Sequence, residues 1–360
     1  MDIKRRSLLA AVPTMLASTS GCVGPLLGAT QTWHRDETEF SPPVVQNQTV
    51  FAGGIDGRVY AFRASDGAVR WATDIGDPMV SFYRAAVRNG TLYIGDTDGY
   101  LHALSTADGT RQWQTQLRSG CCYGPVVVAG TVFVGGNEPH GAVAVTADDG
   151  TVEQRFAGAT DTTMPPAVTA DSVYVGDLSG VVTAFDRDSG DQRWQVSVSA
   201  AEIWTRPAIW NETVFVGDLN GRLHALDTMD GRSRWQFETD GSIYSSPVVH
   251  DGTVYIGSTD RHLYAVSASN GEERWHTATD DGVATPPVAA DNHVYVGDSR
   301  GWVYGMTTTE GKTTWRANVN SSVLMMEAGK VDTIVVALPV GVDNNHVYVA
   351  HAGGLSVYER

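Results

Sequence analysis

Lysine is scarce in this chain of 360 residues and occurs only at positions 4, 312 and 330. The remaining basic residues are arginines, and 25 basic side chains are outnumbered by 41 acidic ones, for a formal net charge of -16. Because such a surface repels phosphate, nucleic acid is excluded as a partner. Aspartate outnumbers glutamate. Few lysines and many short, strongly hydrated carboxylates indicate a protein adapted to high salt. The alternative interpretation is an ordinary acidic protein.

Cysteine and long apolar runs are also scarce. The only cysteines are Cys22 and the adjacent pair Cys121 and Cys122. No apolar run approaches the roughly 20 residues that a membrane-spanning helix needs. A 3.6-residue helical periodicity is absent too, while β-branched and aromatic residues dominate, so the sequence predicts strands and not helices.

The first 22 residues have the pattern of an export signal. A basic segment at residues 4–6 precedes a mostly apolar run at residues 8–17, and small residues follow. The segment Arg5-Arg6-Ser7-Leu8-Leu9 resembles the twin-arginine signal of proteins that fold before they are exported. We therefore expect export of a folded protein.

The signal ends in Gly21-Cys22, which resembles a lipoprotein processing site. At such a site Cys22 becomes the lipidated N-terminus, although Thr19 stands where leucine is usual. We expect a lipid anchor at Cys22, at the outer face of the cytoplasmic membrane, and a short tether over residues 23–32. The exported location permits a disulfide between Cys121 and Cys122.

The rest of the chain is a repeat of about 40 residues. Aromatic residues recur every 38 to 43 positions, and we expect them to pack neighbouring units together. They are Trp33, Trp71, Trp113, Phe156, Trp194, Trp235, Trp275 and Trp315. A second aromatic series, exemplified by Val254-Tyr255, recurs in the same register.

Each unit also contains turn pairs at fixed offsets, such as Asn89-Gly90, Asp98-Gly99 and Asp108-Gly109. An Asn-Gly or Asp-Gly pair between alternating apolar residues predicts a hairpin, so three turns make four strands in each unit. The sequence predicts an all-β fold: an eight-bladed β-propeller of four-stranded antiparallel blades, over residues 33–360.

The ends of the series indicate how the ring closes. The eighth unit stops at Tyr358 after its third strand, whereas Trp33 stands alone before the first full unit. We expect the strand around Trp33 to complete the last blade, which pairs both terminal edges and gives a monomeric ring. Residues 320–343 contain an insertion whose apolar segments predict an added hairpin, or a longer buried strand pair.

The repeat resembles a known family. The unit Val254-Tyr255-Ile256-Gly257, followed by Leu263-Tyr264-Ala265-Val266 and by Asn270-Gly271 before Trp275, is similar to the pyrroloquinoline quinone (PQQ) enzyme repeat. That family includes PQQ-dependent alcohol dehydrogenases and cofactor-free lipoproteins such as the scaffold subunit of the bacterial outer-membrane β-barrel assembly machine. Size and signal favour the second kind, and the composition favours a haloarchaeal source.

Candidate site residues lie where the chain enters each innermost strand, because propeller function concentrates at these loops. In blades three to five one sector carries the cysteine pair, two carboxylates, an aromatic and an arginine. The candidates are Cys121, Cys122, Asp161, Glu202, Trp204 and Arg206, together with Tyr244 and Arg84 in other blades.

The resemblance implies one use of these residues. A PQQ dehydrogenase holds its quinone between a tryptophan and a disulfide of adjacent cysteines, with carboxylates on Ca²⁺ and an arginine near the quinone oxygens. By that analogy Cys121, Cys122, Trp204 or Tyr244, Arg84 and Arg206 would contact the cofactor, and Asp161 and Glu202 the metal ion. No metal-binding asparagine or catalytic base can be assigned.

Structural roles are open for the same residues. The cysteines are alternatively a loop-stiffening disulfide or two thiols, and Trp204 and Tyr244 alternatively fill the channel. The arginines are expected to pair with Asp161 or Glu202. His102 and His224 occupy equivalent Leu-His-Ala-Leu segments, which strand position explains without a metal ion.

Three functions remain. The favoured hypothesis is a non-enzymatic, surface-anchored scaffold for envelope or cell-surface proteins, which requires no cofactor. The second is a PQQ- and Ca²⁺-dependent alcohol or sugar dehydrogenase. The third is a protein whose arginines bind a small anionic ligand.

Overall fold

The computed structural model describes residues 29–76, 84–117, 123–135, 140–157, 164–319, 325–327, 330–334, 341–343, 345–351 and 353–360. The expected signal, Cys22, Cys121, Cys122 and Asp161 lie outside the described residues. Within these ranges all regular secondary structure is β-strand, and no helix is long and apolar enough to cross a membrane.

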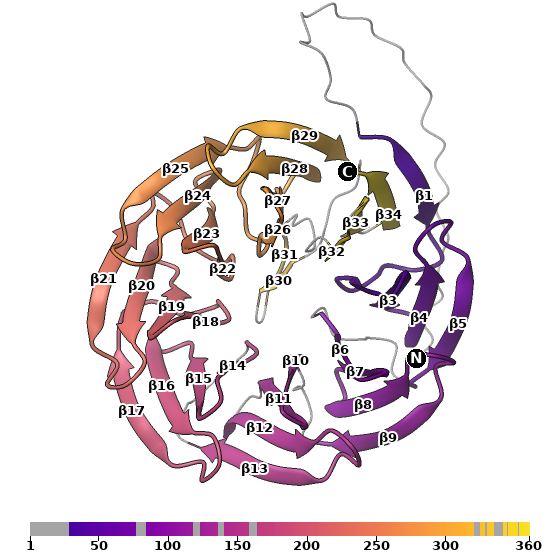
Figure 1. The fold of residues 1–360 in the computed structure, drawn as a ribbon, viewed down its shortest axis with the longest axis horizontal. Coiled ribbons are helices and arrows are strands. Elements are labelled where there is room, and N and C mark those ends of the chain that lie inside the picture. Colours follow the sequence, from indigo (N-terminus) through magenta and orange to yellow (C-terminus); the bar gives the residue numbers. More distant parts are fainter. Residues whose placement is uncertain are drawn as a thin grey trace, which may run out of the picture.

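The strands form eight four-stranded antiparallel sheets arranged in a ring (Figure 1). From innermost to outermost strand, the first four blades are β2 (Val44–Gln46), β3 (Thr49–Gly53), β4 (Arg58–Arg63) and β5 (Val69–Asp74); β6 (Ala86–Arg88), β7 (Thr91–Gly95), β8 (Tyr100–Ser105) and β9 (Arg111–Gln116); β10 (Tyr123–Val128), β11 (Thr131–Gly135), β12 (His140–Thr146) and β13 (Val152–Ala157); β14 (Ala167–Val168), β15 (Ser172–Gly176), β16 (Val181–Asp186) and β17 (Gln192–Ser197). The other four are β18 (Ala208–Trp210), β19 (Thr213–Gly217), β20 (Arg222–Asp227) and β21 (Ser233–Glu238); β22 (Val248–His250), β23 (Thr253–Ser258), β24 (His262–Ser267) and β25 (Glu273–Ala278); β26 (Val288–Ala290), β27 (His293–Gly297), β28 (Trp302–Thr307) and β29 (Thr313–Asn318); β32 (Gly341–Val342), β33 (His346–His351), β34 (Gly354–Glu359) and β1 (Gln31–Arg35). The predicted eight-bladed propeller is confirmed.

The ring has two faces. The loop face carries the connections from the outermost strand of one blade to the innermost strand of the next. The turn face carries the turns between the first and second strands of each blade. In most blades such a turn places a residue at positive φ, a conformation that asparagine and aspartate tolerate: Asn47, Asn89, Ala129, Asn211, Asp251 and Asp291, with φ between 46° and 51°. Ala129 is the one residue of this set that is neither asparagine nor aspartate.

Replacing Ala129 with asparagine should therefore stabilise the protein by about 0.5–1 kcal/mol, because alanine pays a steric cost in the left-handed region. Asn89 has the same φ within a degree, so Asn89→Ala should destabilise by a similar amount. Chemical denaturation of both variants measures the two changes. Equal stability of all three proteins would show that the backbone relaxes at these turns.

Tryptophan side chains join one blade to the next at seven of the eight blades, and Phe156 takes this position in blade 3. The indole N–H of Trp71 donates to the carbonyl of Thr106, at 3.1 Å. Its ring lies against Gly109, whose φ is 74° and where an added Cβ would come within 2.6 Å of the ring. Equivalent N–H bonds of 2.8–3.3 Å are made by Trp33, Trp113, Trp194, Trp235, Trp275 and Trp315. Glycine is thus required beside the tryptophan for space as well as for φ.

The N-terminal strand β1 closes the ring. It pairs antiparallel with β34, so the last blade has the order β1-β34-β33-β32, and the predicted closure is confirmed. Trp33 is 9% exposed and packs against Phe62 of blade 1 and Tyr348 of blade 8. Because blades 1 and 8 hold opposite ends of the chain, the Trp33 side chain links residues near the N-terminus to residues near the C-terminus.

A histidine pair lies within this closure. The rings of His34 (β1) and His351 (β33) stack at 5.6 Å, and both contact the Ser356 hydroxyl, at 3.0 and 2.8 Å. The backbone N–H of Gly353 donates to Nδ1 of His351, at 3.1 Å, so Nδ1 is the unprotonated nitrogen. Burial, and then the proximity of His34, lower the pKa of His351 from 6.5 to about 4.

The closure should consequently weaken in mild acid. Between about pH 6.5 and about 4 the unfolded chain binds a proton at His351 that the folded chain does not, so the free energy of unfolding should fall as the pH falls through this window. Urea denaturation at several pH values measures the slope. His351→Gln should flatten it in that window, whatever its effect at pH 7. An unchanged slope would assign the acid sensitivity to other groups.

The insertion between blades 7 and 8 contains a separate hairpin. Strands β30 (Met325–Glu327) and β31 (Lys330–Ile334) pair antiparallel with each other in a two-stranded sheet outside the blades. In the view along the ring axis the hairpin projects toward the centre (Figure 1). Because it belongs to the connection that enters blade 8, it belongs to the loop face.

Candidate functional site

The described candidate residues all lie on the loop face. Glu202, Trp204 and Arg206 share the connection from β17 to β18, and Tyr244 lies in the next connection, from β21 to β22. Arg84 comes two residues before β6, as Arg206 comes two residues before β18. The structure therefore places one compact group at blades 5 and 6 and one isolated arginine at blade 2.

The connection into blade 5 is fixed by buried residues. Ile203 is 1% exposed and contacts the position of Gly176, where an added Cβ would meet its side chain at 2.7 Å. The buried Thr205 hydroxyl donates to the carbonyl of Gly217 and accepts from its N–H, both at 2.9 Å. The half-buried Trp204 between these anchors and the exposed Arg206 after them therefore project from a main chain that is fixed at two points.

Glu202 has a different partner from the one expected. Its carboxylate accepts the indole N–H of Trp204, two residues along the same connection, and no ion pair joins it to Arg206 within the described part of the chain. Glu202 is therefore not an ion-pair partner of Arg206 among the described residues, and Asp161, the alternative expected partner, lies outside them. Trp204 itself is half-buried.

Hydroxyl residues that the sequence analysis missed anchor the same connection in other blades. Ser245 donates to the carbonyl of Thr285, at 2.9 Å, and Thr285 donates to that of Gly297, at 3.2 Å. Ser41 accepts the N–H of Gly53, at 2.9 Å. The signal was present in the sequence, because a serine or threonine stands two residues before the proline in these units.

Buried aspartates pair with the histidines that the sequence analysis left without partners. Nε2 of His102 lies 2.7 Å from Asp96, and Nε2 of His224 lies 2.8 Å from Asp218. These four side chains are at most 2% exposed. In blade 7 the hydroxyl of Tyr304 makes the same contact with Asp298, at 2.9 Å. The pairs hold the second hairpin together in blades 2, 5 and 7.

Arg84 and Arg206 differ from the other loop-face residues in their electrostatics. Both side chains keep contact with solvent, yet the surrounding ring removes enough water to lower the pKa of the Arg84 guanidinium. Burial also lowers the pKa of Arg206, and the positive charge of Arg84 lowers it further. The strands that follow them, β6 and β18, belong to blades 2 and 5, with blades 3 and 4 between them along one side of the inner ring (Figure 1).

A PQQ and Ca²⁺ site does not fit the residues that the structure describes. They contain no group of three or more His, Cys, Asp or Glu side chains arranged to hold a metal ion. Glu202, the described candidate ligand, is engaged by Trp204. Asp161, Cys121 and Cys122 lie outside the described residues, so no chemistry is assigned to them.

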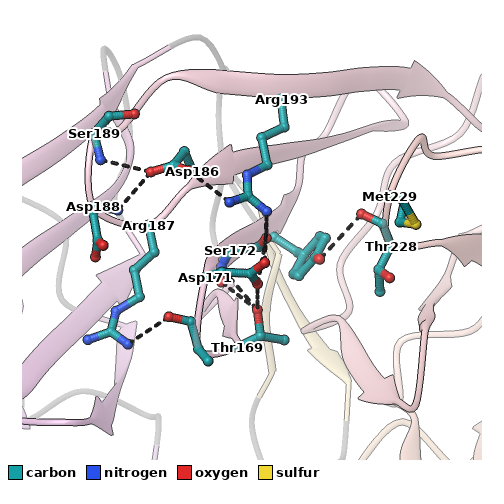
Figure 2. Close-up of polar contacts among 12 residues, drawn as sticks. Thr169, Asp171, Ser172, Asp186, Arg187, Asp188, Ser189, Arg193, Thr228 and Met229 are labelled. Atoms are coloured by element: carbon teal, nitrogen blue, oxygen red, sulfur yellow. Dashed lines mark hydrogen bonds and ion pairs between the residues drawn. The ribbon is translucent and has the colours of Figure 1, made fainter.

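The turn face carries a different kind of cluster, in which charges neutralise one another. In blade 4 the guanidinium of Arg193 lies between Asp171 and Asp186, at 3.1 and 2.7 Å (Figure 2). The backbone N–H of Ser189, and then Arg193, lower the pKa of Asp186 to about 2. These contacts tie β17 to two turns of its own blade, so the cluster is structural.

The fold and loop face define a class: an eight-bladed propeller of PQQ-like repeats whose connections surround one end of the ring axis. The model of the outer membrane protein assembly factor BamB family matches residues 16–73, 80–206 and 178–359. The chain belongs to this family.

Solved structures share the fold. BamB from Moraxella catarrhalis is 21% identical, with a TM-score of 0.72 over 92% of this chain and 98% of that one. The computationally designed Ika8 protein is 13% identical, with a TM-score of 0.78 over 92% and 98%. The quinohemoprotein alcohol dehydrogenase ADHIIG from Pseudomonas putida HK5 is 15% identical, with a TM-score of 0.71 over 91% and 72%. No curated protein sequence matches the chain.

Proposed function

We propose that this chain is an exported, lipid-anchored propeller that serves as a non-enzymatic scaffold for envelope proteins at the outer face of the cytoplasmic membrane. The observation that carries the proposal is the BamB family match, which reaches from residue 16 to residue 359. The closed ring supports it, because rigid blades hold connecting loops in a fixed arrangement suited to docking a partner. Partner docking then takes place on the loop face.

Cross-linking in intact cells tests the docking. Trp204→Ala changes a half-buried aromatic of the loop face, whereas Met229→Ala changes a side chain of the turn face that is 82% exposed. We expect one defined envelope protein to be cross-linked by the wild type and by Met229→Ala, and to be lost with Trp204→Ala. Loss with Met229→Ala instead would place docking on the wrong face, and absence of any partner would contradict the scaffold.

Cell fractionation tests the anchor. With Cys22→Ser the protein should leave the membrane fraction and appear in the medium, because the proposed attachment to the membrane is the lipid on Cys22. Replacing both Arg5 and Arg6 with lysine should retain the precursor inside the cell. A Cys22→Ser protein that stays on the membrane would contradict the lipid anchor while leaving the scaffold proposal intact.

The adjacent cysteines keep a dehydrogenase as the second candidate. Titration of the purified protein with PQQ, with and without Ca²⁺, and tryptophan fluorescence as the readout, separates the two functions. The scaffold predicts no saturable quenching. Ca²⁺-dependent saturation that is lost when Cys121 and Cys122 are changed to serine, together with dye-linked alcohol oxidation, would replace the scaffold with a PQQ dehydrogenase.

A further inference from the structure

Two arginines occupy equivalent places on the inner ring at the loop face. The position lies two residues before the innermost strand in blades 2 and 5, at Arg84 and Arg206. In blades 1, 4, 6 and 7 the corresponding residues are Pro42, Pro165, Ser246 and Pro286. Among these described positions the charge is therefore confined to two sites, and both carry the same sign.

The main chain at both positions is fixed by its neighbours. The backbone N–H of Arg206 donates to the hydroxyl of Ser246 in the next blade, at 2.9 Å, and Thr205 before it is buried. Ala85, directly after Arg84, is 6% exposed and packs in the cluster between blades 1 and 2. The two side chains thus start from rigid points, which lowers the entropy cost of holding a ligand between them.

Neither guanidinium has an acidic partner in the described ranges. Elsewhere in these ranges, arginines commonly pair with carboxylates: Arg35, Arg63, Arg193, Arg222, Arg232, Arg234, Arg300 and Arg360. Glu202, the acidic residue nearest Arg206 in sequence, is bonded to Trp204. In a chain of net charge -16, two cations on one face without an acidic partner among the described residues are an unbalanced local charge, and Arg84 is close enough to Arg206 to lower its pKa.

We propose that Arg84 and Arg206 form a binding site for a small, doubly charged oxyanion at the loop-face end of the inner ring. A guanidinium presents planar N–H donors that match the oxygens of carboxylates and phosphates. One dianion between the two groups removes their repulsion and supplies the missing acceptors. The ligand class is a phosphate or a dicarboxylate.

Isothermal titration calorimetry of the full-length protein in chloride buffer, at constant ionic strength, tests the site with inorganic phosphate and with succinate as probes. We expect saturable binding of at least one probe, weakened roughly tenfold or more by Arg84→Gln and by Arg206→Gln, since each removes charged hydrogen bonds. Binding of phosphate alone would identify a single tetrahedral group as the ligand, and binding of succinate alone a dicarboxylate.

The matched control is Arg232→Gln, because Arg232 is 86% exposed and ion-paired on the turn face. It should bind the probes as the wild type does. Thermal unfolding of each variant separates lost binding from lost folding, and the wild-type melting temperature should rise with the bound probe. Absence of binding of both probes to the folded wild type at millimolar concentration, or equal binding by folded Arg84→Gln and Arg206→Gln, would overturn the proposal.

Discussion

Replacing Trp33 with alanine should lower the free energy of unfolding by about 3–5 kcal/mol, the range for large aromatic side chains removed from a core. Trp33 is buried between blades 8 and 1, donates its N–H to the Ala64 carbonyl at 2.8 Å, and lies against Gly67, whose φ is 68°. The variant leaves a cavity and an unpaired carbonyl. Urea denaturation with tryptophan fluorescence or circular dichroism measures the loss.

Trp194→Ala is the matched control for closure. Trp194 is similarly buried, at 8%, and makes the same N–H bond, to Thr228, at 2.9 Å. Its strand, however, follows β16 of the same blade directly in the chain, whereas β1 has no such connection to blade 8 and is held there by pairing with β34 and by side-chain packing. At equal loss of global stability, Trp33→Ala should expose β1 and β34 to hydrogen exchange sooner. Identical exchange in the two variants would contradict a special role for the closing strand.

The architecture could be predicted because its causes are local and repeated. Turn pairs such as Asn89-Gly90 fix where strands end, and a tryptophan about every 40 residues fixes how blades pack. Closure by β1 followed from counting strands in the eighth unit. None of these inferences needed the distance between two remote side chains.

The partners of the polar residues were harder to predict. The Asp96–His102 and Asp218–His224 pairs had a signal, an aspartate after glycine with a histidine six residues later, and Asp298 with Tyr304 repeats that spacing. The interaction of Arg84 with Arg206 had no such signal, because it depends on how far two side chains reach across a ring. The carboxylate of Glu202 could bond equally well to an indole or a guanidinium, and only geometry selects between them.

Breaking the buried Asp218–His224 pair should have an effect as large as that of Trp33→Ala. Both side chains are fully buried, so His224→Leu removes the imidazole from a buried carboxylate that keeps only Ser199 and the Arg222 N–H as partners in the described ranges, at a cost of about 3–5 kcal/mol. His224→Tyr should cost much less, because Tyr304 makes the equivalent bond to Asp298 in blade 7. The tyrosine also removes Nδ1 of His224, a buried nitrogen without a hydrogen-bond partner among the described residues.

The pH dependence of His224→Leu separates a lost hydrogen-bond partner of Asp218 from lost packing. In the wild type, burial raises the pKa of Asp218, but the His224 ring and the Arg222 backbone N–H outweigh it, and the net pKa is lowered. This carboxylate therefore stabilises the fold at neutral pH, and the contribution is lost as the pH falls through its folded pKa. Without His224 the pKa rises and Asp218 protonates earlier, which removes the buried charge. The stability difference between wild type and variant should consequently shrink in acid, whereas a constant difference would mean that the cost of His224→Leu is packing alone.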